Sequence, residues 1–233
     1  TLIYNGKKYY SKNGLMDLLS GNINETDALY PIIHMSADNF EFAFTHSDKV
    51  YTEEHYSFVN GQNTIHGGTH LAGFREALVK VLKDFYKKDY EPADIRQGLV
   101  AAISLRIEEP VFDSQTKTKL TSTNMKPDGS GTAVKTFIGD IVRKNLDDYL
   151  HINTETAELI LQKIVRNEKE HKGMQNIRKL AKESSKKVRI KNKKLRDCRI
   201  HYNSKDPRRL ESTLFITEGD SASGSITKSR DVN

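Results

Sequence analysis

The residues from Leu214 to Ser225, with the sequence LFITEGDSASGS, constrain this chain more than any other stretch. Four apolar or β-branched residues at its start predict a short buried strand over Leu214–Thr217. Gly219 allows a sharp turn, and Asp220 and Ser221 are suited to cap the helix that follows. In an open α/β sheet, ligands bind beyond the carboxyl ends of the strands. A glutamate carboxylate there, beside a helix N-terminus that attracts phosphate, suits a magnesium ion and a phosphodiester.

The local pattern of strand, glutamate and glycine is also typical of an acidic residue beside an ordinary helix, so these features alone leave the role of Glu218 open. The longer string FITEGDSASGS resembles the opening motif of the Toprim domain in type IIA DNA topoisomerases, in the B subunits of gyrase and topoisomerase IV. The resemblance implies that Glu218 is a metal ligand and a general acid/base in DNA cleavage and rejoining. That family carries an Asp-x-Asp metal pair farther along, which we expect beyond Asn233.

The net charge of +6 is concentrated in one tract. Residues 178–200 contain eleven basic residues against two acidic ones, which leaves the rest of the chain with a net charge of −3. A basic stripe on a nearly neutral body is typical of a protein that binds a phosphate backbone. A solvated helix face or a linker has the same composition. Contact with DNA is therefore a hypothesis for five basic side chains: Lys191, Lys193, Lys194, Arg196 and Arg230.

Composition limits the class of protein. The single cysteine, Cys198, excludes an internal disulfide framework and fits a cytosolic protein. No apolar run approaches the length of a membrane span, and we find no secretory signal at the start. His66 and His70 are four residues apart, but the glycines between them argue against one continuous helix. Loop and cap roles are therefore favoured over a zinc site.

The first sixty residues predict small elements. Thr1–Tyr10 predicts a strand pair that turns at Asn5-Gly6. Asn13 is expected to cap a short helix that ends at Gly21. Between residues 29 and 60, apolar residues alternate with polar ones, which predicts strands.

The middle of the chain predicts longer elements. Thr69 is expected to cap a helix with one apolar face, formed by Leu71, Phe74, Leu78, Val81, Leu82 and Phe85. Leu99–Ile107 predicts an apolar strand. Helical periodicity runs from 133 to 166 with a break around His151–Asn153, where Asn153 or Thr154 is expected to cap the second segment. A polar helix is expected to continue to about Lys187, and a helix of that length would act as a lever.

The stretch from Val111 to Leu120 carries three long polar side chains. If it is extended, Gln115, Lys117 and Lys119 project on one side. Two ammonium groups and an amide would then reach a common phosphate. An exposed edge strand with protective lysines has the same pattern, so the residues alone leave both interpretations open.

Three further segments carry a second resemblance. IHGGTHLAGFREAL, DIRQGLVAAISLRI and SQTKTKL resemble, in order and spacing, successive segments of the transducer domain in the same topoisomerase B subunits. The resemblance implies that Gln115 and Lys117 reach the γ-phosphate of ATP held by the neighbouring ATPase domain. It implies an α+β fold: a transducer domain like a ribosomal-protein βαβ unit, with a left-handed crossover that the usual rule would not predict, a long C-terminal helix, and the first strand and helix of an α/β Toprim domain.

The resemblance also implies an organisation and a set of partners. Residues 1–20 would end a GHKL-type ATPase domain, 25–190 would form the transducer domain with its long helix, 191–207 a basic linker, and 208–233 the start of Toprim. The cofactors would be Mg²⁺ and ATP. The partners would be DNA and an A subunit that carries the nucleophilic tyrosine, within an A2B2 heterotetramer that contains a B-subunit dimer, in the bacterial cytoplasm at the nucleoid.

The complete enzyme would pass one DNA duplex through a break in another, driven by ATP. We find no ATP-lid motif, no general base for ATP hydrolysis and no Asp-x-Asp pair in this sequence, so the segment alone is expected to be inactive. A non-catalytic module that binds nucleic acid through residues 178–199 is an alternative, but it leaves QTKTK and EGDSA without a role. A mismatch-repair-type ATPase has a similar transducer and lacks EGDSA. Gyrase and topoisomerase IV are not separated, although the KLRDC linker leans towards topoisomerase IV.

Overall fold

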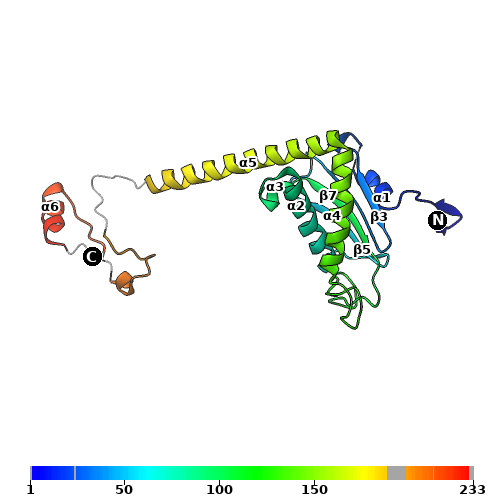
Figure 1. Ribbon diagram of the computed structural model, residues 1–233. Coiled ribbons are helices and arrows are strands. Elements are labelled where there is room, and N and C mark those ends of the chain that lie inside the picture. Colours follow the sequence, from blue (N-terminus) through cyan, green and yellow to red (C-terminus); the bar gives the residue numbers. More distant parts are fainter. Residues whose placement is uncertain (1, 24, 188–197, 212, 231–233) are drawn as a thin grey trace. The chain divides into compact units, whose positions relative to one another are not determined.

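The computed structural model describes residues 2–23, 25–187, 198–211 and 213–230 (Figure 1). The chain divides into two compact units, unit 1 (Thr1–Gln175) and unit 2 (Asn176–Asn233). Unit 1 combines a sheet with packed helices, which agrees with the predicted α+β class. Within the described ranges, no helix combines the length and the apolar character that crossing a membrane requires.

Unit 1 is built around a five-stranded sheet in the order β3-β4-β7-β5-β6. The strands are β3 (Ile33–Ala37), β4 (Phe40–His46), β5 (Glu54–Val59), β6 (Gln62–Asn63) and β7 (Leu99–Leu105). β4 pairs antiparallel with β3 and β7, and β5 pairs parallel with β7 and antiparallel with β6. The chain connects β5 to β7 through α2 (Thr69–Tyr86) and α3 (Pro92–Arg96), which is the predicted βαβ unit. The left-handed sense of this crossover stays a prediction.

Both faces of the central strands are buried, which accounts for the continuous apolar run of β7. One face contributes alternate residues to the larger core beneath α2 and α4 (Val134–Ile152): Phe40, Phe42, Phe44, Leu99, Ala101, Ile103 and Leu105. The opposite face packs Ala43, Val100 and Ala102 against Leu15 and Leu19 of α1 (Leu15–Asn22). The period-two alternation of side chains therefore places the sheet between two helical layers.

The N-terminal hairpin forms as predicted. β1 (Leu2–Tyr4) and β2 (Lys7–Tyr9) pair antiparallel, and Asn5 and Gly6 both have positive φ, at 48° and 74°. Two such residues suit the twist of a two-residue hairpin loop. The helix that follows begins at Leu15 and ends at Asn22, slightly later at both ends than expected. Asn13 does not cap it, because its side-chain Nδ2 donates to Asp17 Oδ1 at 3.1 Å. A single turn of 3₁₀ helix, Glu25–Asp27, follows.

The two long helices of unit 1 have the predicted apolar faces. Along α2, four residues of the expected stripe are buried and two are half-buried. The expected cap is wrong, because Gly68 occupies the N-cap position and Thr69 is the first helical residue. The predicted break between the following helices lies at Asn153, after which α5 (Thr154–Lys187) begins. Asn153 closes α4 by donating from Nδ2 to Tyr149 O at 3.0 Å.

Unit 2 contains a 3₁₀ turn, Pro207–Leu210, and the helix α6 (Asp220–Ser229). The helix predicted after the EGDS motif is confirmed, although Gly219 rather than Asp220 or Ser221 holds the N-cap position. The strand predicted over 214–217 is wrong: these residues pair with no described segment, and Leu214, Phe215 and Ile216 are 80%, 58% and 88% exposed. A strand gains stability only from neighbouring strands and a covered face, and the described residues of unit 2 provide neither.

Three imidazoles of unit 1 are held in the neutral form by their surroundings. Burial lowers the pKa of His46, His55 and His70 from the ordinary 6.5 to about 4 in each case, and the Arg96 charge adds to the effect at His55. The unfolded chain therefore takes up these protons below about pH 6.5, whereas the folded chain takes them up only near pH 4. Their contribution to folding is complete above pH 6.5 and declines as the pH falls through that window.

We predict that the free energy of unfolding falls on acidification from pH 6.5 to pH 4, and each buried histidine contributes about 1.4 kcal/mol per pH unit between its two pKa values. Urea denaturation at intervals of half a pH unit measures the slope. His70→Gln should reduce this slope, and His66→Gln, at an exposed position in the loop before α2, is the matched control. A slope that is flat in this window, or equal for the two variants, would contradict the assignment.

Candidate functional site

The stretch that carries Gln115 and Lys117 is a tight turn rather than an extended strand. Lys117 N donates to Ser114 O at 3.0 Å, and Lys117 has φ of 55°, in the left-handed region. Below the turn the two arms pair through a Phe112–Leu120 bridge and a bond from Asp113 N to Lys119 O at 3.1 Å. The stretch is therefore not extended, and the condition under which Gln115, Lys117 and Lys119 would project on one side is not met. The turn instead places Gln115 and Lys117 at the tip of a short hairpin.

This hairpin is attached to the beginning of α2 by backbone hydrogen bonds. Leu120 N donates to Gly67 O at 3.0 Å, and Thr69 N donates to Leu120 O at 3.1 Å. Thr69 Oγ1 also donates to Ser122 O at 2.7 Å. The Leu120 carbonyl of the hairpin therefore accepts a hydrogen bond from an N–H group at the start of α2. The Thr69 side chain had been expected to supply such an acceptor as the N-cap. The HGGTH and QTKTK motifs form one structural unit.

The tip of the hairpin is exposed while its base is buried. Leu120 is 1% exposed and belongs to the large core, whereas Gln115, Lys117 and Lys119 are exposed. A cavity of about 870 Å³ opens near the end of β7, and its lining includes neither Gln115 nor Lys117. An exposed amide and ammonium at a fixed tip are able to bind a phosphate only if another surface holds the rest of that ligand.

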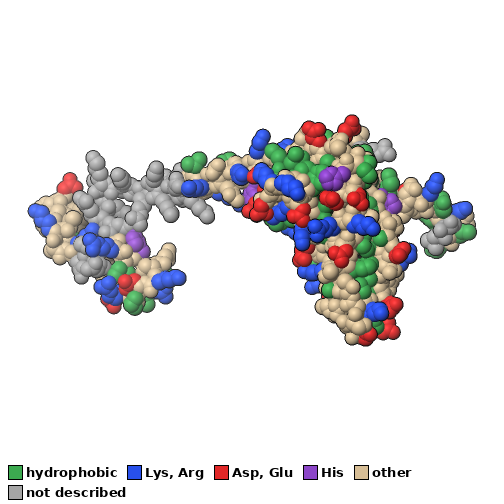
Figure 2. All heavy atoms as spheres, in the orientation of Figure 1, with side chains coloured by type: hydrophobic (Ala, Val, Ile, Leu, Met, Phe, Trp, Pro, Cys, Tyr) green, Lys and Arg blue, Asp and Glu red, His purple; other side chains and the backbone are tan. Residues whose placement is uncertain are grey.

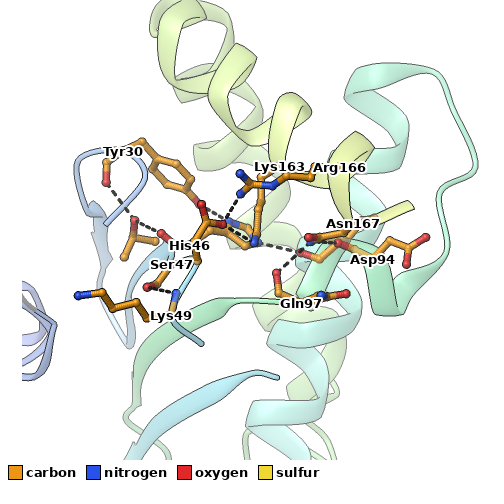
Figure 3. A network of polar contacts seen from close by, with 12 residues as sticks. Tyr30, His46, Ser47, Lys49, Asp94, Gln97, Lys163, Arg166 and Asn167 are labelled. Atoms are coloured by element: carbon orange, nitrogen blue, oxygen red, sulfur yellow. Dashed lines mark hydrogen bonds and ion pairs between the residues drawn. The ribbon is translucent and has the colours of Figure 1, made fainter. Parts of the chain in front are cut away.

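At its other end, α2 is connected to α5. Tyr86 Oη donates to Ala157 O at 2.5 Å, and Lys88 Nζ lies 2.9 Å from Glu168 Oε2. Between Ala157 and Glu168 on α5, Lys163 Nζ lies 2.8 Å from Asp48 Oδ1, and Arg166 pairs with the same carboxylate (Figure 3). α2 thus has the hairpin at one end and the first turns of α5 at the other.

The Asp48 carboxylate is charged in spite of its partial burial. Burial alone raises its pKa, but the hydrogen bonds and positive charges of Lys163 and Arg166 outweigh that effect and leave the pKa below its ordinary value. The Lys163 side chain is only 6% exposed, so removing Asp48 would leave a buried ammonium group without this partner. Sequence reasoning missed these residues, because Asp48 and Lys163 are 115 positions apart and no local pattern pairs them.

The other predicted site residues lie in unit 2. Glu218 is exposed, immediately before Gly219 and the first turn of α6, so its carboxylate is open to a metal ion. Arg230 follows α6 and donates from its backbone N to Ile226 O at 2.9 Å. Lys191, Lys193, Lys194 and Arg196 lie outside the described residues. Among the residues that are described, no group of three or more metal-ligating side chains gathers, and His66 and His70 are no exception.

The described surface of unit 1 does not form a single basic patch on the face in view. Figure 2 shows Lys and Arg side chains interspersed with Asp and Glu side chains there. Two of the basic residues are already paired: Arg75 and Arg96 both contact Glu53, which also lies 3.2 Å from His55 Nε2. The excess of basic residues found in the sequence therefore does not belong to this face.

Comparison with known proteins places this arrangement in a family. The model of the DNA gyrase B family matches residues 8–180. The chain belongs to the DNA gyrase B family. Among curated members, it is 43% identical over 229 residues to the B subunit of DNA topoisomerase 4 from Borreliella burgdorferi, and 32% identical over 245 residues to the B subunit of DNA gyrase from Cytophaga hutchinsonii. These matches cover 98% and 96% of this chain, but only 37% and 46% of those relatives.

Solved structures of the gyrase B family share the fold. The 43K ATPase domain of Thermus thermophilus gyrase B, solved with an aminocoumarin, aligns with a TM-score of 0.55 and 25% identity over 72% of this chain and 45% of that one. The ATP-binding domain of topoisomerase IV from Francisella tularensis aligns equally well at 21% identity, over 70% of this chain and 44% of that one, and supports the fold alone. The family predicted from the three transducer-like segments is thereby confirmed.

The attachment of the hairpin to α2 requires a glycine at position 68. Gly68 has φ of +136°, and a Cβ there would lie 2.3 Å from Leu120 O. We predict that Gly68→Ala lowers the free energy of unfolding by roughly 2–5 kcal/mol, because backbone strain and overlap add.

Gly61→Ala is the matched control, since Gly61 also has positive φ (+80°) but nothing within 4 Å of the added carbon. It should cost about 1–2 kcal/mol, the backbone term alone. Chemical denaturation of both variants measures the difference, and equal costs would mean that the contact between residue 68 and Leu120 does not hold the hairpin in place.

Proposed function

We propose that this chain is the transducer part of the B subunit of an ATP-dependent type IIA DNA topoisomerase, with segments of the two adjoining domains. The observation that carries the proposal is the Ser114–Lys117 turn in a chain of the gyrase B family: the turn is exposed, and backbone bonds at the base of its hairpin hold that hairpin against the start of α2. We keep the proposed boundaries: 1–20 for the end of the ATPase domain, 25–190 for the transducer, 191–207 for the linker and 208–233 for the start of Toprim.

In this proposal, Gln115 and Lys117 bind the γ-phosphate of ATP that a neighbouring ATPase domain holds. The amide donates one hydrogen bond and the ammonium supplies a compact positive charge. Both groups are at the tip of the hairpin and exposed, so they meet the phosphate without rearrangement of the core. The contact exists only while the γ-phosphate is present, so the hairpin distinguishes ATP from its hydrolysis products.

Glu218 is proposed to hold Mg²⁺ and to assist proton transfer in DNA cleavage and rejoining. An exposed carboxylate is a ligand type that Mg²⁺ accepts, and this ion is commonly bound by one or two carboxylates together with phosphate oxygens. The ion would stabilise negative charge on the attacking and leaving oxygens. The carboxylate orients the site and exchanges a proton with the reacting hydroxyl.

The proposed partners are DNA and an A subunit. DNA would contact the basic tract, including Lys191, Lys193, Lys194 and Arg196, and Arg230 after α6. An A subunit would supply the nucleophilic tyrosine, in an A2B2 enzyme of the bacterial cytoplasm at the nucleoid. The higher identity to the topoisomerase 4 relative, 43% against 32% for the gyrase relative, supports the same lean towards topoisomerase IV as the KLRDC linker.

The first test is Lys117→Ala in the complete subunit, assembled with its A subunit. We predict that ATP turnover falls by roughly 10²-fold, the usual effect of removing one charge-stabilising donor, while ATP-independent DNA cleavage is retained. Lys119→Ala is the matched control, because Lys119 is an exposed lysine of the same hairpin outside the turn. Unchanged turnover in Lys117→Ala would remove this residue from the mechanism.

The second test separates the DNA chemistry from the nucleotide chemistry. Glu218→Gln should lower Mg²⁺-dependent DNA cleavage by roughly 10²-fold or more and leave ATP turnover near that of the parent enzyme. Glu211→Gln, which alters an exposed acid of the same unit, serves as the control. If cleavage by Glu218→Gln equals that of the parent at every Mg²⁺ concentration, the assignment of Glu218 is wrong.

A further inference from the structure

Three buried polar side chains of unit 1 form a row from Tyr30, before β3, through His46, at the end of β4, to Asn167 on α5. Tyr30, His46 and Asn167 are 3%, 0% and 1% exposed. Tyr30 bonds directly to His46, and His46 and Asn167 each bond to backbone carbonyl groups between Asp94 and Gln97. Tyr30 Oη lies 2.5 Å from His46 Nδ1, and His46 Nε2 lies 2.8 Å from Ile95 O. Asn167 Nδ2 donates to Asp94 O at 2.8 Å and to Gln97 O at 3.1 Å (Figure 3). We call Tyr30, His46, Asn167 and these carbonyls of α3 and its C-cap Gln97 the polar row.

The direction of each hydrogen bond follows from its partners. A carbonyl oxygen only accepts, so His46 Nε2 carries the proton that bonds to Ile95 O. His46 is neutral, because burial lowers its pKa to about 4, and its Nδ1 therefore accepts the Tyr30 hydroxyl proton. Only one tautomer and one ring orientation of His46 satisfy both contacts. A shift of Tyr30 or of α3 therefore breaks one of the two His46 hydrogen bonds unless the ring moves with it.

Stability alone does not account for the polar row. Apolar residues in its place would avoid the cost of burying hydroxyl, imidazole and amide groups. The row also leaves one atom unsatisfied: Asn167 Oδ1 is buried without a hydrogen-bond partner among the described residues. Such a network restricts geometry at a cost in free energy, which is typical of groups that position one element against another.

The two ends of the row lie where the chain enters and leaves the transducer body. Tyr30 precedes β3, on the segment that joins the sheet to α1 and the N-terminal hairpin. Asn167 lies on α5 one turn before His171, whose Nδ1 is 3.1 Å from Asp94 Oδ1, and residues 172–180 of α5 are exposed. Residue 175 is the last of unit 1.

From these contacts we propose that Tyr30, His46 and Asn167 are positioning residues that couple the N-terminal segment to the root of α5. The proposal rests on the proposed function, since it assigns how a movement that follows ATP binding reaches α5. A displacement of the segment that carries Tyr30 turns His46, and His46 acts on the end of α3 that Asn167 holds. Because α5 rises ~1.5 Å per residue, a tilt of about 5° at Asn167 moves Lys187 by about 3 Å.

The test uses the complete enzyme with its A subunit and compares Tyr30→Phe with Tyr86→Phe. Both variants lose one tyrosine hydroxyl, but Tyr86 Oη bonds to Ala157 O in the first turn of α5, outside the polar row. The measurement is the number of ATP molecules consumed per strand-passage event. We expect Tyr30→Phe to raise this number about fivefold or more and Tyr86→Phe to leave it within about twofold of the parent.

A double-mutant cycle with Asn167→Ala decides whether the two ends act together. Coupling through the row predicts that the double variant is no more inefficient than the worse single variant, whereas independent effects multiply. Hydrogen exchange in the folded chain provides a readout that needs no activity: Tyr30→Phe should accelerate exchange at residues 163–171, and Tyr86→Phe should not.

Any one of three results would overturn the inference. Tyr30→Phe could consume as much ATP per strand-passage event as the parent enzyme, or the effects of Tyr30→Phe and Asn167→Ala on this number could multiply. The third result is unchanged hydrogen exchange at residues 163–171 in Tyr30→Phe. In those cases the parent enzyme still performs ATP-dependent strand passage. A parent enzyme that performs none would overturn the proposed function itself, so the two failures are distinguishable.

Discussion

The backbone contact between Leu120 and the Gly67–Thr69 segment is the constraint on which the rest of unit 1 depends. Through it, one short hairpin closes the start of α2 and also holds Leu120 in the core. The hairpin tip cannot shift without disturbing the first turn of α2, and α2 packs along α4. A signal received at Lys117, as proposed, would therefore enter the packed body directly, because close-packed interiors transmit displacement rather than absorb it.

The sites proposed for nucleotide sensing and for DNA chemistry lie in different units, with Lys117 in the first and Glu218 in the second. Both side chains are exposed to solvent, and a single exposed side chain does not enclose a ligand. Each would receive its ligand from another surface: an ATPase domain for Lys117, and DNA with a metal ion for Glu218. α5 begins in the first unit, and its last residues belong to the second. The polar row and the Asp48–Lys163 pair determine how the root of that helix is held.

Local sequence patterns predicted the elements that local physics decides. The Asn5-Gly6 hairpin, the apolar strand β7 and the break at Asn153 all follow from turn chemistry and periodicity. The Ser114–Lys117 turn was missed because its positive φ falls on a lysine rather than a glycine. The strand at 214–217 was expected from residues that are apolar but have no described strand to pair with. The polar row was beyond prediction, since His46 and Ile95 are 49 positions apart.

The most direct test of the central claim is a structure of the complete A2B2 enzyme with a non-hydrolysable ATP analogue, in which the distance from Lys117 Nζ to the γ-phosphate oxygens is measured. Our account predicts a direct contact of roughly 2.7–3.2 Å, made by a turn that keeps its bonds to α2. A nucleotide fully bound in the ATPase domain with Lys117 Nζ more than about 6 Å from every γ-phosphate oxygen, beyond the reach of a hydrogen bond, would contradict it.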